Sequence, residues 1–137
     1  RRFENWENNY AAKLGLGRAI DYALDIGIAA IEQEVLRLAT KLRGLLAEVP
    51  GVTVQDIGKR QCGIVTWSVE GVAAQHLETR LRDTGFLVSV SSPFSTLIDA
   101  TRRKLPDLVR SGVHYYNTDE ELEALVAQVR AILQAMD

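Results

Sequence analysis

Apolar residues recur at intervals of three and four in four segments of the chain. The clearest stripe lies in residues 28–49 and predicts an amphipathic helix that ends at Pro50-Gly51. The same spacing predicts helices over residues 10–27, over 72–84 and from Thr118 onward. Thr118 and Glu121 also form a capping-box pattern, which is typical of a helix start.

Between these helices, apolar and branched residues alternate with polar ones over short runs, which predicts strands at 52–54, 62–69, 86–91 and 109–115. The first two flank a glycine turn and predict an antiparallel hairpin. Residues 92–108 contain two of the three prolines and are expected to form a long loop. This order of elements predicts an α+β fold, with a small, antiparallel-rich sheet of about four strands and helices packed on it.

The chain has the size of one domain, with 137 residues, 47% apolar residues and a net charge of -2. This charge favours neither nucleic acid nor an anionic membrane as a partner. No apolar run is long enough for a membrane span and no signal-peptide pattern opens the chain, so we expect a cytoplasmic protein. The chain begins with Arg1-Arg2 and looks like a piece of a longer one.

Cys62 is the only cysteine, so no disulfide is expected, and the two histidines lie far apart, so no metal site is predicted. Within the predicted strand 62–69, a lone cysteine is more typical of a small buried hydrophobe than of a nucleophile.

The most suggestive charge of the chain is Arg110, in the predicted strand 109–115. Strand alternation places Arg110 and Gly112 on one face, which leaves open space beside the guanidinium. A planar carboxylate could bind there through two parallel hydrogen bonds, and a surface ion pair is the alternative. Ser89 and Ser91, at the end of the predicted strand 86–91, are candidates for lining such a pocket.

Several motifs occur together in an order that resembles one known family. They are Arg2-Phe3-Glu4 with Asn9, Gly15-Leu16-Gly17, Pro50-Gly51-Val52, Gly63-Ile64-Val65, and Arg110 followed by Tyr116-Asn117-Thr118. With these motifs the chain resembles the C-terminal part of a class V aminotransferase. This family of pyridoxal-phosphate (PLP) enzymes includes cysteine desulfurases, selenocysteine lyases and isopenicillin N epimerase-like proteins.

The resemblance implies the small C-terminal domain of a fold type I PLP enzyme. Residues 1–27 would form a lead-in and an interdomain helix, and residues 28–137 the small domain. The partners it implies are a PLP-binding large domain that is missing here, an amino-acid substrate and a second copy in a homodimer. In this family the arginine before the Tyr-Asn-Thr motif binds the substrate α-carboxylate, which assigns that role to Arg110 and favours it over the ion pair.

The resemblance also bears on the cofactor. The lysine that binds PLP covalently lies upstream of the Arg-Phe-Glu motif in the family, and none of the four lysines takes its place; they are Lys13, Lys41, Lys59 and Lys104. We therefore expect the fragment alone neither to hold PLP nor to turn over. Asn9 and Glu7 are candidates for contact with the cofactor, although a carboxylate at Glu7 would repel a phosphate.

The full-length protein is accordingly expected to act on an amino acid as an aminotransferase, lyase or epimerase, in the transferase or lyase class. A desulfurase is disfavoured because residues 92–108 contain no cysteine, whereas desulfurases of the family carry one after the third strand. Ser89 also stands where many relatives have an arginine. The alternative is a non-catalytic α/β module for small-ligand binding or oligomerisation.

Overall fold

The computed structural model describes residues 8–136, which divide into two compact units between Gln33 and Glu34. The first unit holds helix α1 (Tyr10–Ile26) and the first turns of α2 (Ile28–Ala47). Asn9 caps the start of α1, and Gly27, with a positive φ of 98°, ends it. No residue of α1 is buried, and its large apolar side chains are exposed.

The second unit is built on a four-stranded sheet in the order β1-β2-β4-β3, formed by β1 (Val52–Val54), β2 (Ile64–Val69), β3 (Ser89–Ser91) and β4 (Leu108–Gly112). Every neighbouring pair is antiparallel. The predicted α+β class, the antiparallel sheet of four strands and the hairpin of its first two strands are therefore confirmed.

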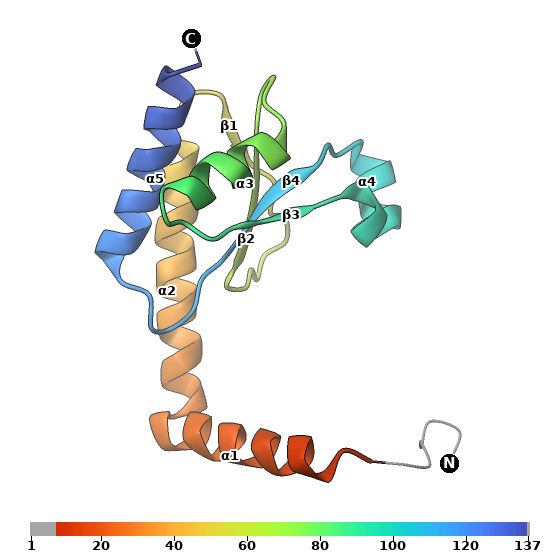
Figure 1. Ribbon diagram of the computed structural model, residues 1–137, viewed down its shortest axis with the longest axis vertical. Helices are drawn as coiled ribbons and strands as arrows, with labels where there is room; N and C mark the ends of the chain where they lie inside the picture. The colour runs from red at the N-terminus through yellow and green to blue at the C-terminus, as the bar shows by residue number, and fades with distance from the viewer. Residues whose placement is uncertain (1–7, 137) are drawn as a thin grey trace. The chain divides into compact units, whose positions relative to one another are not determined.

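One face of the sheet forms the core with three helices: α3 (Ala74–Asp83), α5 (Asp119–Gln134) and the part of α2 that belongs to this unit. Figure 1 shows α5 running beside this part of α2, with α3 across the strands. Trp67 of β2 is the largest fully buried side chain among the described residues. Alternation places it on the core face together with Val65, Val109 and Ser111, all of which are buried.

Residues 92–108 are not the predicted loop, because they contain a 3-10 helix, η1 (Pro93–Thr96), and a short helix, α4 (Leu97–Arg103). Arg103 connects this segment to another part of the chain by donating to the Gln55 carbonyl oxygen at 2.6 Å. Within α4 it also donates to Asp99 at 3.1 Å. In Figure 1, α4 lies at the end of the β3–β4 pair, away from α5. The segment is thus ordered by contacts with the chain that follows β1, which local sequence patterns do not reveal.

Three predicted strands are shorter in the structure. β2 begins at Ile64, so Cys62 lies before the strand and is exposed, and its interpretation as a buried hydrophobe was wrong. β4 ends at Gly112. Gly63 precedes β2 in a tight place, because a Cβ there would lie 2.5 Å from Val35 Cγ1 and 2.7 Å from the Val113 carbonyl oxygen.

A cluster of charged side chains joins α2 to the start of α5. Arg37 donates to both oxygens of Asp119, at 3.0 and 2.8 Å, and Lys41 lies 2.8 Å from the same carboxylate. The hydrogen bonds from Arg37 and Lys41 hold the pKa of Asp119 well below its usual range. Asp119 also lies in the first turn of α5, where a negative charge is favourable.

This cluster leads to a pH-dependent stability. The pKa of Asp119 is lower in the folded chain than in the unfolded one, so its contribution is complete above the unfolded pKa of about 4 and decreases as the pH falls below it. Asp119→Asn is therefore expected to lower the urea midpoint of unfolding at about pH 7, by an amount that shrinks between about pH 4 and pH 2. Glu48→Gln, on an exposed carboxylate at the end of α2, is the control. A difference that stays constant over this pH range would contradict the assignment.

Within residues 8–136, each helix is too short or too polar to cross a lipid bilayer.

Candidate functional site

The face of the sheet opposite the core carries a row of three polar side chains across three strands. Thr66 of β2 and Ser89 of β3 are both paired with Arg110 of β4, one on each side of it. Directly opposite residues on antiparallel strands share a face, with Cβ atoms about 5 Å apart. The register therefore brings a guanidinium and two hydroxyl groups together on three adjacent strands.

Arg110 is exposed and open on this face. Among residues 8–136, its guanidinium forms no hydrogen bond or ion pair. A Cβ at Gly112, two residues along the same strand face, would meet no atom within 4 Å, so space lies beside the arginine as the sequence predicts. A planar cation with five donors, fixed on a strand and without a counter-ion, suits a carboxylate that binds through two hydrogen bonds.

The hydroxyl groups around Arg110 are held in different ways. Thr66 donates from its hydroxyl to Asp56 Oδ1 at 2.5 Å, and its backbone N–H donates to the same oxygen at 2.9 Å. Ser89 Oγ lies 3.5 Å from the Arg110 carbonyl oxygen, at the outer limit of a hydrogen bond. Ser91 is paired with Leu108, two residues before Arg110 in the strand. Both serines of the prediction thus lie on the strand next to Arg110, and Ser89 is directly beside it.

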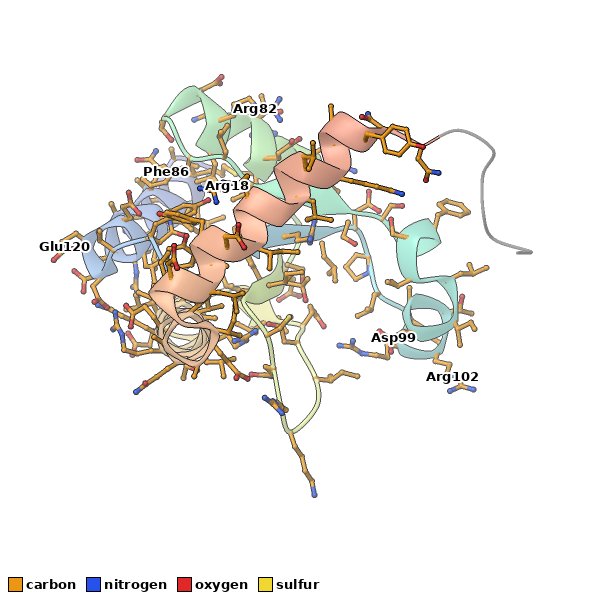
Figure 2. The ribbon with its side chains drawn as sticks, turned by 90° about the horizontal axis from the view of Figure 1, so that it is seen from below. Arg18, Arg82, Phe86, Asp99, Arg102 and Glu120 are labelled. Atoms are coloured by element: carbon orange, nitrogen blue, oxygen red, sulfur yellow. The ribbon has the colours of Figure 1, made fainter. Side chains whose placement is uncertain are left out.

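Helix α4 lies beyond one end of the β3–β4 pair (Figure 1). Figure 2 shows Asp99 and Arg102 on α4, on the opposite side of the strands from Phe86 and Glu120. Phe94, Leu97 and Ile98 present exposed apolar side chains from η1 and α4. An ordered, partly apolar segment therefore begins two residues after β3 ends.

A cavity of about 420 Å³ opens at the other end of β4, between Phe86, Gly112 and Asn117. Its carboxylate, Glu121, accepts hydrogen bonds from Asn117 Nδ2 at 3.0 Å and from the Thr118 backbone N–H at 3.1 Å, as part of the capping box of α5. These bonds lower the pKa of Glu121. The Glu121 carboxylate already accepts hydrogen bonds at the start of α5. The cavity therefore has fewer free polar groups for a ligand than the face that carries Arg110.

Glu7 and Asn9 are the two residues predicted to contact the cofactor. Glu7 is outside the described residues, and Asn9 uses its side chain to accept the Ala12 N–H at 2.9 Å. Lys13 Nζ donates to Asn8 Oδ1 at 2.8 Å, and Lys41 is paired with Asp119 and Glu123. Contact of Asn9 and Glu7 with the cofactor stays a prediction, and residues 8–136 hold no group of three or more metal-ligating side chains.

The family of the chain follows from comparison with known proteins. Residues 1–125 match the family model of class V aminotransferases, described as Aminotransferase class-V. The chain belongs to the class V aminotransferase family, as its sequence motifs predict.

Individual relatives point to one branch of this family. The chain is 33% identical to a cysteine desulfurase of Synechococcus elongatus over 134 residues, which cover 96% of this chain and 21% of that protein. It is also 33% identical to a probable cysteine desulfurase of Halalkalibacterium halodurans, covering 90% of this chain and 30% of the relative. The chain therefore spans less than a third of these relatives.

A solved structure supports the fold. The apo cysteine desulfurase from Thermococcus onnurineus NA1 matches with a TM-score of 0.88 and 24% identity, over 98% of this chain and 34% of that one. The preference against a desulfurase, which rested on the lack of a cysteine in residues 92–108, is thereby wrong: the named relatives with 26–33% identity are cysteine desulfurases or probable ones. A single loop residue was given more weight than the similarity of the whole chain supports.

The sequence prediction missed Thr66, which the structure places opposite Arg110, and Asp56, which accepts hydrogen bonds from Thr66. Thr66 lies in a predicted strand, but the partner strand and register that bring it beside Arg110 are not visible in one sequence. The only local signal was a hydroxyl residue between the buried Val65 and Trp67, which assigns it to the open face.

Proposed function

We propose that this chain is the C-terminal domain of a PLP-dependent cysteine desulfurase, a longer protein that releases sulfur from L-cysteine and leaves alanine. The division into residues 1–27 and 28–137, the large domain and the homodimer belong to this proposal. The observation that carries it is Arg110, an arginine that no side chain of residues 8–136 pairs with, on the open face of a domain whose named relatives are desulfurases or probable ones.

In this proposal the chain binds and orients the substrate. Arg110 grips the α-carboxylate with its guanidinium, and Ser89 lies beside it on β3. Two hydrogen bonds to a group held on a strand fix the direction of the amino acid, which favours reaction because it removes rotational freedom in advance. PLP, held by the large domain, supplies the electron sink for the chemistry at the amino acid.

The assay must supply the electrons and protons that release of sulfide from cysteine requires. Conversion of cysteine to alanine and hydrogen sulfide consumes two electrons and two protons, which two thiols provide on forming a disulfide. Cys62 is the only cysteine of this chain and lies outside residues 92–108, so the proposal requires that sulfur leave to a thiol other than one in this segment. Dithiothreitol can serve as that thiol in the test.

The test uses the full-length protein with PLP, L-cysteine and dithiothreitol, and measures alanine and sulfide. We expect the two products in equal amounts. Pyruvate with ammonia in place of alanine would show elimination and overturn the desulfurase assignment. Failure to bind PLP, seen as the lack of a visible absorption band, would favour a non-catalytic module.

A further inference from the structure

A second arginine, Arg43 of α2, forms an ion pair close to the open face. Its Nε donates to Asp56 Oδ2 at 2.7 Å, and both side chains are only 11% exposed. Arg43 also donates to the carbonyl oxygens of Cys62 and Ile64, at 2.8 and 2.9 Å. A carboxylate so far removed from water needs a cation partner, and Arg43 is that partner.

Asp56 lies one side chain away from Arg110. Its Oδ1 accepts the Thr66 hydroxyl, and Thr66 is the residue directly opposite Arg110 across the β2–β4 pair. The negative charge of the largely buried Asp56 and the positive charge of the exposed Arg110, separated by Thr66, attract each other. Among residues 8–136, however, no side chain pairs with the Arg110 guanidinium, and Asp56 is joined to Arg43.

We propose that the ion pair with Arg43 neutralises the Asp56 carboxylate, so that Asp56 does not compete for Arg110. The Arg110 guanidinium then stays free to bind the carboxylate of the substrate. Arg43 and Asp56 are then positioning residues: they touch no substrate, and they act through the charge that Arg110 experiences. Without Arg43, the negative charge of Asp56 competes with the substrate for the same guanidinium. This inference rests on the proposed role of Arg110.

A purely structural role of Arg43 makes a different prediction. Arg43 also holds the chain before β2 through two carbonyl oxygens, so its loss weakens that connection whatever the charge of Asp56. Removing the Asp56 charge in addition does not restore those hydrogen bonds. Only the competition for Arg110 is relieved by the second substitution, and this separates the two explanations.

The experiment compares variants of the full-length protein by two measurements. One is the KM and kcat for L-cysteine. The other is the inhibition constant of 3-mercaptopropionate, which has the carboxylate and thiol of cysteine but no amino group. For Arg43→Met we expect KM and the inhibition constant to rise about tenfold, with kcat changed by no more than about twofold.

Two further variants complete the design. In Arg43→Met with Asp56→Asn, both constants should return to within about threefold of the wild type, although the urea midpoint remains lowered. Arg43→Lys keeps the positive charge beside Asp56 but loses part of the hydrogen bonding, so its KM and inhibition constant should lie closer to the wild type than those of Arg43→Met. Arg43→Gln, whose amide can still donate to the carbonyl oxygens, replaces the methionine variant if that one does not fold.

The inference is overturned if the double variant binds 3-mercaptopropionate as poorly as Arg43→Met, or if Arg43→Met binds it as well as the wild type. Arg110→Ala separates this result from a failure of the proposed function. If Arg110→Ala leaves the inhibition constant unchanged, the role of Arg110 itself is wrong. If it raises the constant and Arg43→Met does not, only the role of Arg43 is wrong.

Discussion

Arg110→Ala is expected to raise the KM of the full-length protein for L-cysteine by about 30-fold to 100-fold, which corresponds to about 2–3 kcal/mol. The physical reason is the loss of a charged group that donates two hydrogen bonds to the substrate carboxylate. No other side chain of the described residues pairs with the Arg110 guanidinium. A spectral titration with L-cysteine, followed at the cofactor absorption band, measures the same loss as weaker binding.

Two variants make this prediction specific. Arg110→Lys keeps the charge but lacks the planar pair of donors, so its KM should lie between those of the wild type and Arg110→Ala. Arg102→Ala removes an exposed arginine on α4 and should leave KM within about twofold of the wild type. An unchanged KM for Arg110→Ala, or an equal rise for Arg102→Ala, would contradict the carboxylate assignment.

The fold could be predicted from the sequence because its strongest signals are local and agree with one another. The apolar stripe of residues 28–49 and the capping box of Thr118 and Glu121 each correspond to an observed helix. The alternation around Arg110 places Val109 and Ser111 in the core and Arg110 outside. These features depend on the periods of helix and strand, which a single sequence displays.

The ends of the strands and the segment after β3 could not be predicted in the same way. β2 begins after Gly63, because that glycine lies against Val35 and the Val113 carbonyl oxygen, residues far away in the sequence. Helix α4 is fastened by Arg103 to the Gln55 carbonyl oxygen, 48 residues earlier. Such long-range contacts decide where an element begins or ends, and local sequence patterns do not predict them.

For the candidate site, the sequence supplied the arginine but not its surroundings. Period-two alternation was enough to put Arg110 and Gly112 on an open face. The neighbours of Arg110 come from the β2–β4 and β3–β4 registers, and the restraint on Asp56 comes from α2. A candidate binding group can thus be found from one strand, whereas the side chains around it are known only once the strands are paired and the helices are packed on them.

The stability of this sheet depends most on Trp67, and Trp67→Ala is expected to lower the free energy of unfolding by about 4 kcal/mol. The indole is fully buried, and its Nε1 donates to Ser111 Oγ at 3.1 Å. Alanine leaves a large cavity beneath β2 and β4 and also leaves the buried hydroxyl without this partner. Urea unfolding of the 137-residue chain, followed by circular dichroism, measures the loss.

Two further variants set the scale of this effect. Trp67→Phe keeps most of the apolar contact but removes the N–H donor, so a loss of about 2 kcal/mol is expected, and this variant should stay folded if alanine is not tolerated. Tyr116→Ala, at a ring that is 70% exposed, should cost less than about 1 kcal/mol. A loss below about 2 kcal/mol for Trp67→Ala would contradict this prediction. It would show that neighbouring side chains relax into the cavity and that the packing between β2, β4 and the helices is less specific than the buried indole indicates. The full loss would mean that the core face holds β2 and β4 in the register that sets Arg110 between Thr66 and Ser89.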